Sequence, residues 1–119
     1  MATDPYEIHV EECLATFARE LDTDRKGVEW HTEFHRSRHY SLAGNLVFSP
    51  LEAPERELAV VSVQLKPEAG WTFDAIDEGA VIKAEAQVAA SANLPTVVQE
   101  LSAFLVGARP LVLAALVDA

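Results

Sequence analysis

The chain has 119 residues, of which 50% are hydrophobic and 24% charged, and its formal net charge is −10. This length suits one domain, residues 1–119, that buries its own hydrophobic core. The acidity argues against nucleic acid and anionic membrane surfaces as partners, because the chain repels phosphate groups. Basic proteins and cations are the partners that this charge favours.

Cysteine usage and the chain ends bear on location. Cys13 is the only cysteine, so an intramolecular disulfide and a multi-cysteine metal site are excluded. The first residues lack the basic segment and apolar run of a signal peptide. The C-terminal apolar run is interrupted by Glu100, Arg109, Pro110 and Asp118. We therefore expect no membrane span and a cytoplasmic protein.

A helix is predicted from Pro5 to Leu21. Asp4 is suited to cap it and Pro5 to occupy its first position. Apolar residues recur with a 3.6-residue period and make one stripe: Tyr6, Val10, Cys13, Leu14, Phe17 and Leu21. We interpret Cys13 as a small buried hydrophobic residue rather than a nucleophile. The helix is followed by a polar connector that ends at Gly27, which is suited to a turn with positive φ.

The stretch from Val28 to Arg36 alternates between apolar and polar residues, which is typical of a half-buried β-strand. One face carries Val28, Trp30 and Phe34. The other face carries Glu29, His31, Glu33 and His35. A helix is rejected because it would scatter the aromatic residues relative to Val28.

Further strands are predicted at Asn45–Pro50, Leu58–Lys66 and Ala80–Val88. In the second of these, the core face is expected to carry Ala59, Val61, Val63 and Leu65. The segment Pro67–Gly79 is ambiguous, because its Trp71–Asp74 part fits either an edge strand or a loop that closes over the core.

A second helix is predicted from Leu94 to about Gly107, and its apolar pattern resumes after Pro110. Gly107 and Pro110 predict either a kinked helix or two short ones. This end of the chain is apolar over more than one face, so a second cover is expected, and we predict that it is another subunit. The predicted dimer interface comprises Leu101, Phe104, Leu105, Leu111, Leu113 and Leu116.

These elements predict an α+β fold: an N-terminal helix, a mainly antiparallel sheet of three to four strands, and a kinked or split C-terminal helix. The short connections between strands favour hairpins over crossover units.

One candidate site lies on the polar face of the first strand. His31, Glu33 and His35 have the side chains that bind zinc or non-haem iron, so a divalent transition metal is the cofactor that they would hold. His39 is the available extra imidazole. The alternative is a solvent-facing polar row in which Glu and His side chains pair across the sheet.

A second candidate site is the cationic segment that follows this strand. Arg36, Arg38 and His39 lie close to Glu29 and Glu33 in the sequence. They either form surface ion pairs with these glutamates or bind an anionic ligand or an acidic motif of a partner. The predicted partner-binding residues are therefore Glu29, Arg36, Arg38 and His39.

The sequence contains no glycine-rich phosphate loop and no recognisable nucleophile motif, so no catalytic residue is predicted. The first hypothesis is a small acidic binding or regulatory protein that forms a homodimer and recognises a protein partner. In size, charge and order of elements the chain is similar to secretion chaperones and immunity proteins, a likeness of composition and architecture alone. A metal-dependent or acid/base enzyme that uses His31, Glu33 and His35 is the second hypothesis. The third is a small-molecule binder with its ligand near Trp30, Phe34 and Trp71.

Overall fold

The structure is a computed structural model that describes residues 4–36 and 41–117. Its elements follow one another as α1 (Pro5–Arg19), a short 3-10 helix η1 (Thr23–Lys26), β1 (Val28–His35), β2 (Leu42–Pro50), β3 (Ala59–Lys66), β4 (Gly70–Asp77), β5 (Ile82–Val88) and α2 (Leu94–Val117). The five strands form one sheet in the order β1-β2-β3-β4-β5, and every neighbouring pair is antiparallel.

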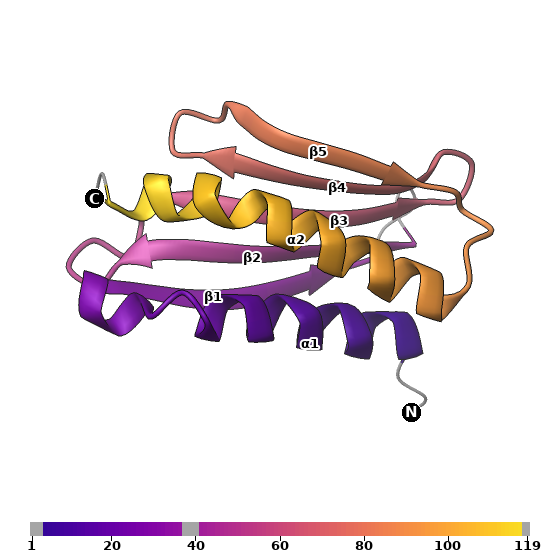
Figure 1. Cartoon of the computed structure of the whole chain (residues 1–119), viewed down its shortest axis with the longest axis horizontal. Coiled ribbons are helices and arrows are strands. Elements are labelled where there is room, and N and C mark those ends of the chain that lie inside the picture. Colours follow the sequence, from indigo (N-terminus) through magenta and orange to yellow (C-terminus); the bar gives the residue numbers. More distant parts are fainter. Residues whose placement is uncertain (1–3, 37–40, 118–119) are drawn as a thin grey trace.

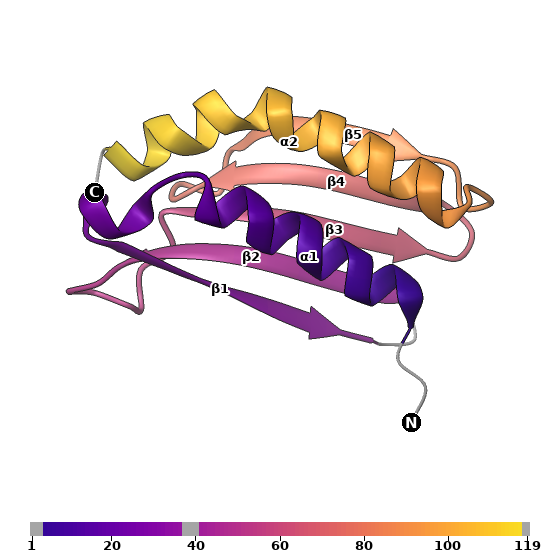
Figure 2. The same cartoon turned by 60° about the horizontal axis from the view of Figure 1, so that its bottom comes forward.

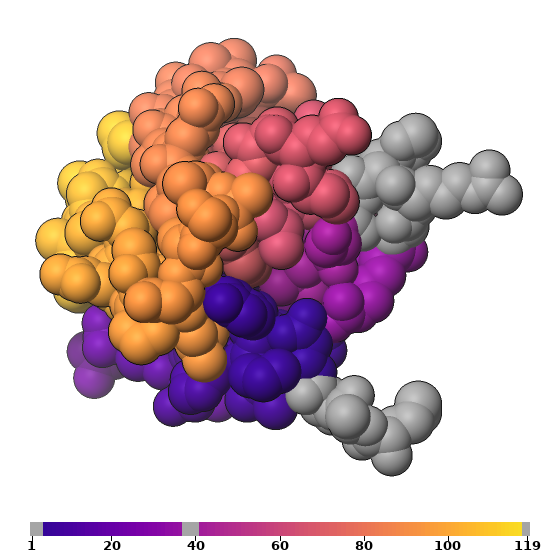
Figure 3. Space-filling model, turned by 90° about the vertical axis from the view of Figure 1, so that its right-hand side faces the viewer, coloured from indigo at the N-terminus to yellow at the C-terminus, as the bar shows by residue number. Residues whose placement is uncertain are grey.

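Both helices lie on the same face of the sheet and run in the same direction across it (Figures 1 and 2). The first helix, α1, contacts β1 and β2, whereas α2 contacts β3, β4 and β5. The opposite face of the sheet carries no helix of the described residues. Figure 3 views the molecule from the end at which both helices begin, where the indigo and orange segments touch.

The core lies between the sheet and the two helices, and it forms one cluster. Its largest fully buried side chains include Trp71, Phe48, Phe73, Leu14 and Leu101. Each strand contributes alternate residues, because side chains in a strand point to opposite faces. The predicted core face of β3 is confirmed for Ala59, Val61 and Val63, which are all fully or almost fully buried.

The N-terminal helix begins as the sequence predicts. The Asp4 carboxylate accepts a hydrogen bond of 2.8 Å from the Tyr6 backbone N–H, and Pro5 is the first helical residue. This cap satisfies one of the donors that a helix leaves free at its start. Gly27 has a φ of +68°, which confirms the predicted turn.

The predicted alternation of β1 is also confirmed. Val28 is buried, and Trp30 and Phe34 are half-buried against the core. The residues of the other face are exposed: Glu29, His31, Glu33 and His35. Gly44 of β2 lies beneath Phe34, where a Cβ atom would come within 2.5 Å of the phenylalanine Cε1 atom. The ring of Phe34 therefore uses the space that the missing side chain leaves.

The prediction of three to four strands was wrong by one strand. The ambiguous segment forms β4, which is an interior strand between β3 and β5 rather than an edge strand or a loop. Trp71, Phe73 and Ala75 share its core face and are buried. The second strand also begins earlier than predicted, at Leu42.

The C-terminal helix is a single helix of 24 residues that continues through Pro110, so the prediction of two short helices was wrong. Pro110 and the residue four positions earlier, Val106, are both exposed. Because the carbonyl group that proline cannot bond lies on this exposed side, water can satisfy it and the helix need not end. A kink at Pro110 stays a prediction.

Candidate functional site

The predicted metal ligands lie on the edge strand β1, on the face of the sheet that the helices leave open. The Nε2 atom of His31 lies 2.7 Å from Oε1 of Glu33, and Nε2 of His35 lies 3.6 Å from Oε2 of the same carboxylate. The side chains of His31, Glu33 and His35 are 52%, 43% and 62% exposed. One carboxylate is thus shared between two imidazoles on one strand.

The geometry of this cluster is that of a hydrogen-bonded surface group. A hydrogen bond with His31 lowers the pKa of the Glu33 carboxyl. Within residues 4–36 and 41–117, no group of three or more His, Cys, Asp or Glu side chains is placed to hold a metal ion. The β2 residues opposite His31 and Glu33 are Val47 and Asn45, so β2 adds no imidazole or carboxylate beside them. Metal binding at His31, Glu33 and His35 stays a prediction.

The predicted partner-binding residues are only partly described. Glu29 is exposed on β1, and Arg38 and His39 lie outside the described residues. Arg36 binds Asp4 Oδ2 at 3.1 Å and Glu7 Oε1 at 3.3 Å. Its Nη1 atom also donates to a backbone carbonyl at 2.8 Å, that of Ser41. The arginine is therefore ion-paired, but with the first turn of α1 rather than with the glutamates of β1.

A polar row crosses the open face of the sheet, and sequence reasoning did not find it. The strand registers place Glu33, Asn45, Ser62, Asp74 and Glu85 in direct succession, one from each strand. The Ser62 hydroxyl donates a 2.7 Å hydrogen bond to Asn45 Oδ1. The Oδ1 atom of Asp74 is buried without a hydrogen-bond partner. The alternation in each strand indicates the face, but only the register brings these five residues together.

Asp74 is the member of this row whose negative charge is unfavourable. Burial raises the pKa of its carboxyl, and the Glu85 carboxylate acts in the same direction, while Ser62 opposes them. Two carboxylates directly opposite each other in a sheet repel when both are ionised. Above the folded-state pKa, the ionised Asp74 therefore lowers the stability of the fold.

We expect Asp74→Asn to raise the free energy of unfolding at pH 7 by roughly 0.2–1 kcal/mol. The wild-type chain should gain stability from Asp74 as the pH falls through its raised folded-state pKa, because the folded state then binds the proton more tightly than the unfolded state. The advantage of the variant should therefore shrink towards about pH 4. Urea unfolding at several pH values measures this difference. Asp24→Asn removes the same charge from an exposed position, and a destabilised Asp74→Asn chain at pH 7 would contradict the prediction.

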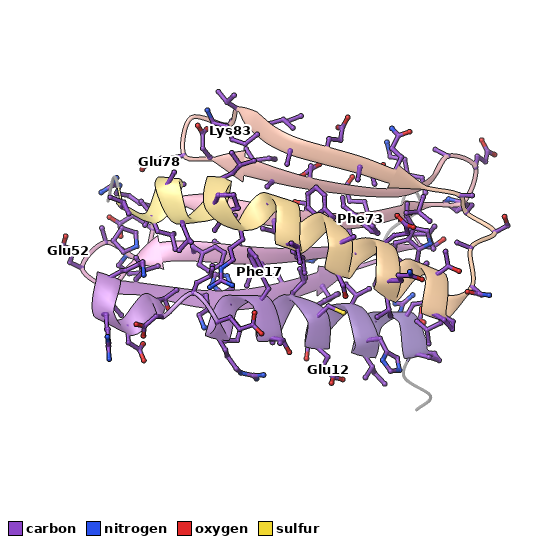
Figure 4. The ribbon with its side chains drawn as sticks, in the orientation of Figure 1. Glu12, Phe17, Glu52, Phe73, Glu78 and Lys83 are labelled. Carbon is purple, nitrogen blue, oxygen red and sulfur yellow. The ribbon has the colours of Figure 1, made fainter. Side chains whose placement is uncertain are left out.

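An open groove of about 390 Å³ runs between α1 and α2. Its lining residues on α1 are His9, Glu12, Cys13, Thr16, Phe17 and Glu20. Those on α2 are Val98, Ser102, Leu105, Val106 and Arg109. Figure 4 shows the labelled Phe17 between the two helices and Glu12 at the outer surface of α1. The sequence gives the apolar stripe of each helix, but not the gap that two neighbouring helices leave between them.

Cys13 lines this groove and is half-buried rather than enclosed in the core. Burial raises the pKa of its thiol; a hydrogen bond with Ser102 acts in the opposite direction. Because the thiolate is the reactive form, the thiol is less nucleophilic than a free cysteine at neutral pH. The interpretation of Cys13 as a small buried hydrophobic residue rather than a nucleophile stays a prediction.

The predicted dimer-interface residues fall into two groups. Leu101, Leu105 and Leu116 are no more than 5% exposed and belong to the core of the single chain. Phe104 and Leu113 are partly buried against the same core, and Leu111 is 38% exposed. The most exposed large apolar side chains of α2 are instead Val106 at 75% and Val117 at 72%. Val106 and Val117 were not among the predicted interface residues, and the dimer interface itself stays a prediction.

By length and composition alone, α2 is apolar enough to cross a membrane, with a mean hydropathy of 1.7 over its most apolar window. Six of its residues are buried in the described fold: Val97, Leu101, Leu105, Ala108, Val112 and Leu116. Since the core helix of a soluble protein passes the same test, this finding does not assign a location.

The aromatic residues predicted to surround a small ligand are engaged in packing. Trp71 is 1% exposed and stacks on Tyr6 with a ring-centroid distance of 5.7 Å. The Arg19 guanidinium lies over the Trp30 ring, 5.9 Å from its centroid, and Phe34 covers Gly44.

Comparison with protein-family models, with curated proteins and with solved structures finds no match for the chain.

Proposed function

We propose that the chain is a small acidic binding or regulatory protein that forms a homodimer and recognises a protein partner. The exposed apolar side of α2 is the observation that carries this proposal. This helix has only two charged residues among its 24, Glu100 and Arg109. Leu111 and Val117 are exposed on it, and a second molecule that covers them removes apolar surface from water.

The homodimer is supported by the distribution of charge. Acidic residues gather on the first part of the chain, at Asp4, Glu7, Glu11, Glu12, Glu20, Asp22 and Asp24. Two copies of an acidic chain repel each other least through their least charged element, which is α2. A contact between two copies of α2 is also self-complementary, as a twofold interface requires.

We expect light scattering after gel filtration at micromolar concentration to give twice the chain mass of 13.0 kDa. The double variant Leu111→Lys/Val117→Lys should be monomeric, because each lysine places a charge in the apolar contact. Lysine also reduces the net negative charge, so general repulsion cannot explain a loss of association.

The control is Ile8→Lys, which changes an exposed apolar residue on α1, 48% exposed, to the same cation. It should leave the dimer intact. A wild-type chain that is monomeric at these concentrations would contradict the homodimer, and a dimer that survives the α2 double variant would contradict this interface.

A further inference from the structure

We infer that the groove between α1 and α2 binds a basic amphipathic helix of about three turns, supplied by the protein partner. This inference rests on the proposed function, since it names the class of partner. It places the partner between the helices, on a surface different from the proposed dimer contact at Leu111 and Val117.

The groove has an apolar floor. Phe17 and Leu105 lie at its base with 6% and 5% exposure, and Cys13 and Val98 are half-buried above them. Val106 lies on its α2 side and is 75% exposed. An occupant with an apolar stripe would shield these side chains from water, which is how amphipathic helices bind in hydrophobic grooves.

The dimensions fit a helix. The lining residues run from His9 to Glu20 on α1 and from Val98 to Arg109 on α2. Each range rises roughly 16 Å, or about three helical turns. Both helices run in the same direction across the sheet (Figures 1 and 2), and both line the groove over this length. A third helix laid between them contacts both walls through residues spaced three and four apart.

The charge of the walls selects a basic occupant. Glu12 and Glu20 line the groove on its α1 side, and both are exposed at its outer edge. The α2 wall carries one cation, Arg109, whose guanidinium lies 3.5 Å from the Glu20 carbonyl oxygen and so spans the groove at that end. A helix with lysine or arginine along the flank that faces α1 matches this arrangement. A second copy of the chain, with a net charge of −10, does not.

The test compares two labelled peptides of about 14 residues by fluorescence anisotropy. Both have the same leucine stripe at helical spacing, and their polar positions are all lysine in one and all glutamate in the other. We expect the lysine peptide to bind at least tenfold more tightly than the glutamate peptide. The charge-reversal variant Glu12→Lys/Glu20→Lys should reduce or invert this preference.

The location of the bound peptide is tested with two neighbouring tryptophan substitutions. Ser102→Trp fills the groove, because Ser102 is exposed and lines it. Ala103→Trp adds the same side chain at the next residue, which is exposed and does not line the groove. We expect Ser102→Trp to weaken the lysine peptide at least tenfold and Ala103→Trp to leave its affinity unchanged, with the thermal midpoint of each variant as the test of folding.

Cys13 provides a second readout in the unaltered chain, because it is the only cysteine and lies in the groove. A saturating lysine peptide should slow its modification by a small methanethiosulfonate reagent at least fivefold. Equal affinity for the two peptides, unchanged Cys13 modification, or equal effects of the two tryptophan substitutions would overturn the inference. A change in oligomeric state in Ser102→Trp alone would also overturn it, because the groove would then be a subunit contact.

The two proposals fail separately. If the chain is a dimer that does not bind the lysine peptide, only the assignment of the groove is contradicted. If the chain is a monomer that binds the peptide and protects Cys13, only the homodimer is contradicted.

Discussion

Replacing Trp71 with alanine should lower the free energy of unfolding by roughly 3–5 kcal/mol, as is usual when a large buried aromatic side chain is removed. Trp71 is 1% exposed and lies on the interior strand β4. Its ring stacks on Tyr6 of α1 at 5.7 Å and contacts Phe73 at 6.4 Å between ring centroids. The substitution therefore leaves a cavity between the sheet and the start of α1.

The natural control is the other tryptophan, Trp30, on the edge strand β1. It is half-buried, and its ring contacts the Arg19 guanidinium at 5.9 Å. We expect Trp30→Ala to cost no more than about 2 kcal/mol, since an exposed cation–π contact and partial burial are worth less than a filled core position. Urea unfolding followed by circular dichroism measures both variants. Equal losses would show that Trp71 is not the centre of the core.

Trp71 also lies in β4, the strand that the sequence analysis did not predict as a strand of the sheet interior. Trp71, Phe73 and Ala75 alternate with polar or exposed positions, which is the pattern of a strand with one buried face. The alternation was obscured by the glycines at both ends of the segment and by the acidic residues within and after it. The Asp74 side chain lies on the face of β4 opposite to the core. Its charge is therefore compatible with a strand that has one buried face.

Other parts of the fold were predictable because local chemistry decides them. The cap at Asp4, the turn at Gly27 and the two faces of β1 each follow from a few neighbouring residues. In α2 the local signal was misleading, since proline usually ends a helix. Tertiary packing prevailed there: Ala108 and Val112, on either side of Pro110, are both buried in the core.

The candidate sites were less predictable, because they depend on how elements meet. The row that contains Ser62 and Asp74 needs the register of all five strands. The groove needs the spacing between α1 and α2, which are separated in sequence by the whole sheet. Ion pairing of Arg36 with Glu29 and Glu33 was one of two alternatives, but its partners are Asp4 and Glu7, which are distant in sequence and were not predicted.

Gly70→Ala is the second substitution for which we expect a large loss of stability, about 3 kcal/mol. Gly70 opens β4 with a φ of +94°, a conformation that residues with a side chain rarely adopt. A Cβ atom there would lie 2.6 Å from the Val88 carbonyl oxygen and 2.9 Å from the Ala90 backbone nitrogen. Both atoms belong to the backbone, one at the last residue of β5 and one two residues after it, so the collision cannot be relieved by rotating a side chain.

Gly27→Ala separates the two causes. Gly27 also has a positive φ, +68°, but no atom lies within 4 Å of the position that a Cβ would take. This variant should show only the cost of the left-handed conformation, about 1 kcal/mol. Chemical unfolding gives the free energy of unfolding of each variant. The difference between the two losses measures the cost of the collision between a Cβ atom at Gly70 and the backbone of Val88 and Ala90. If both variants lost the same stability, the contact of Gly70 with Val88 and Ala90 would be looser than the structure shows.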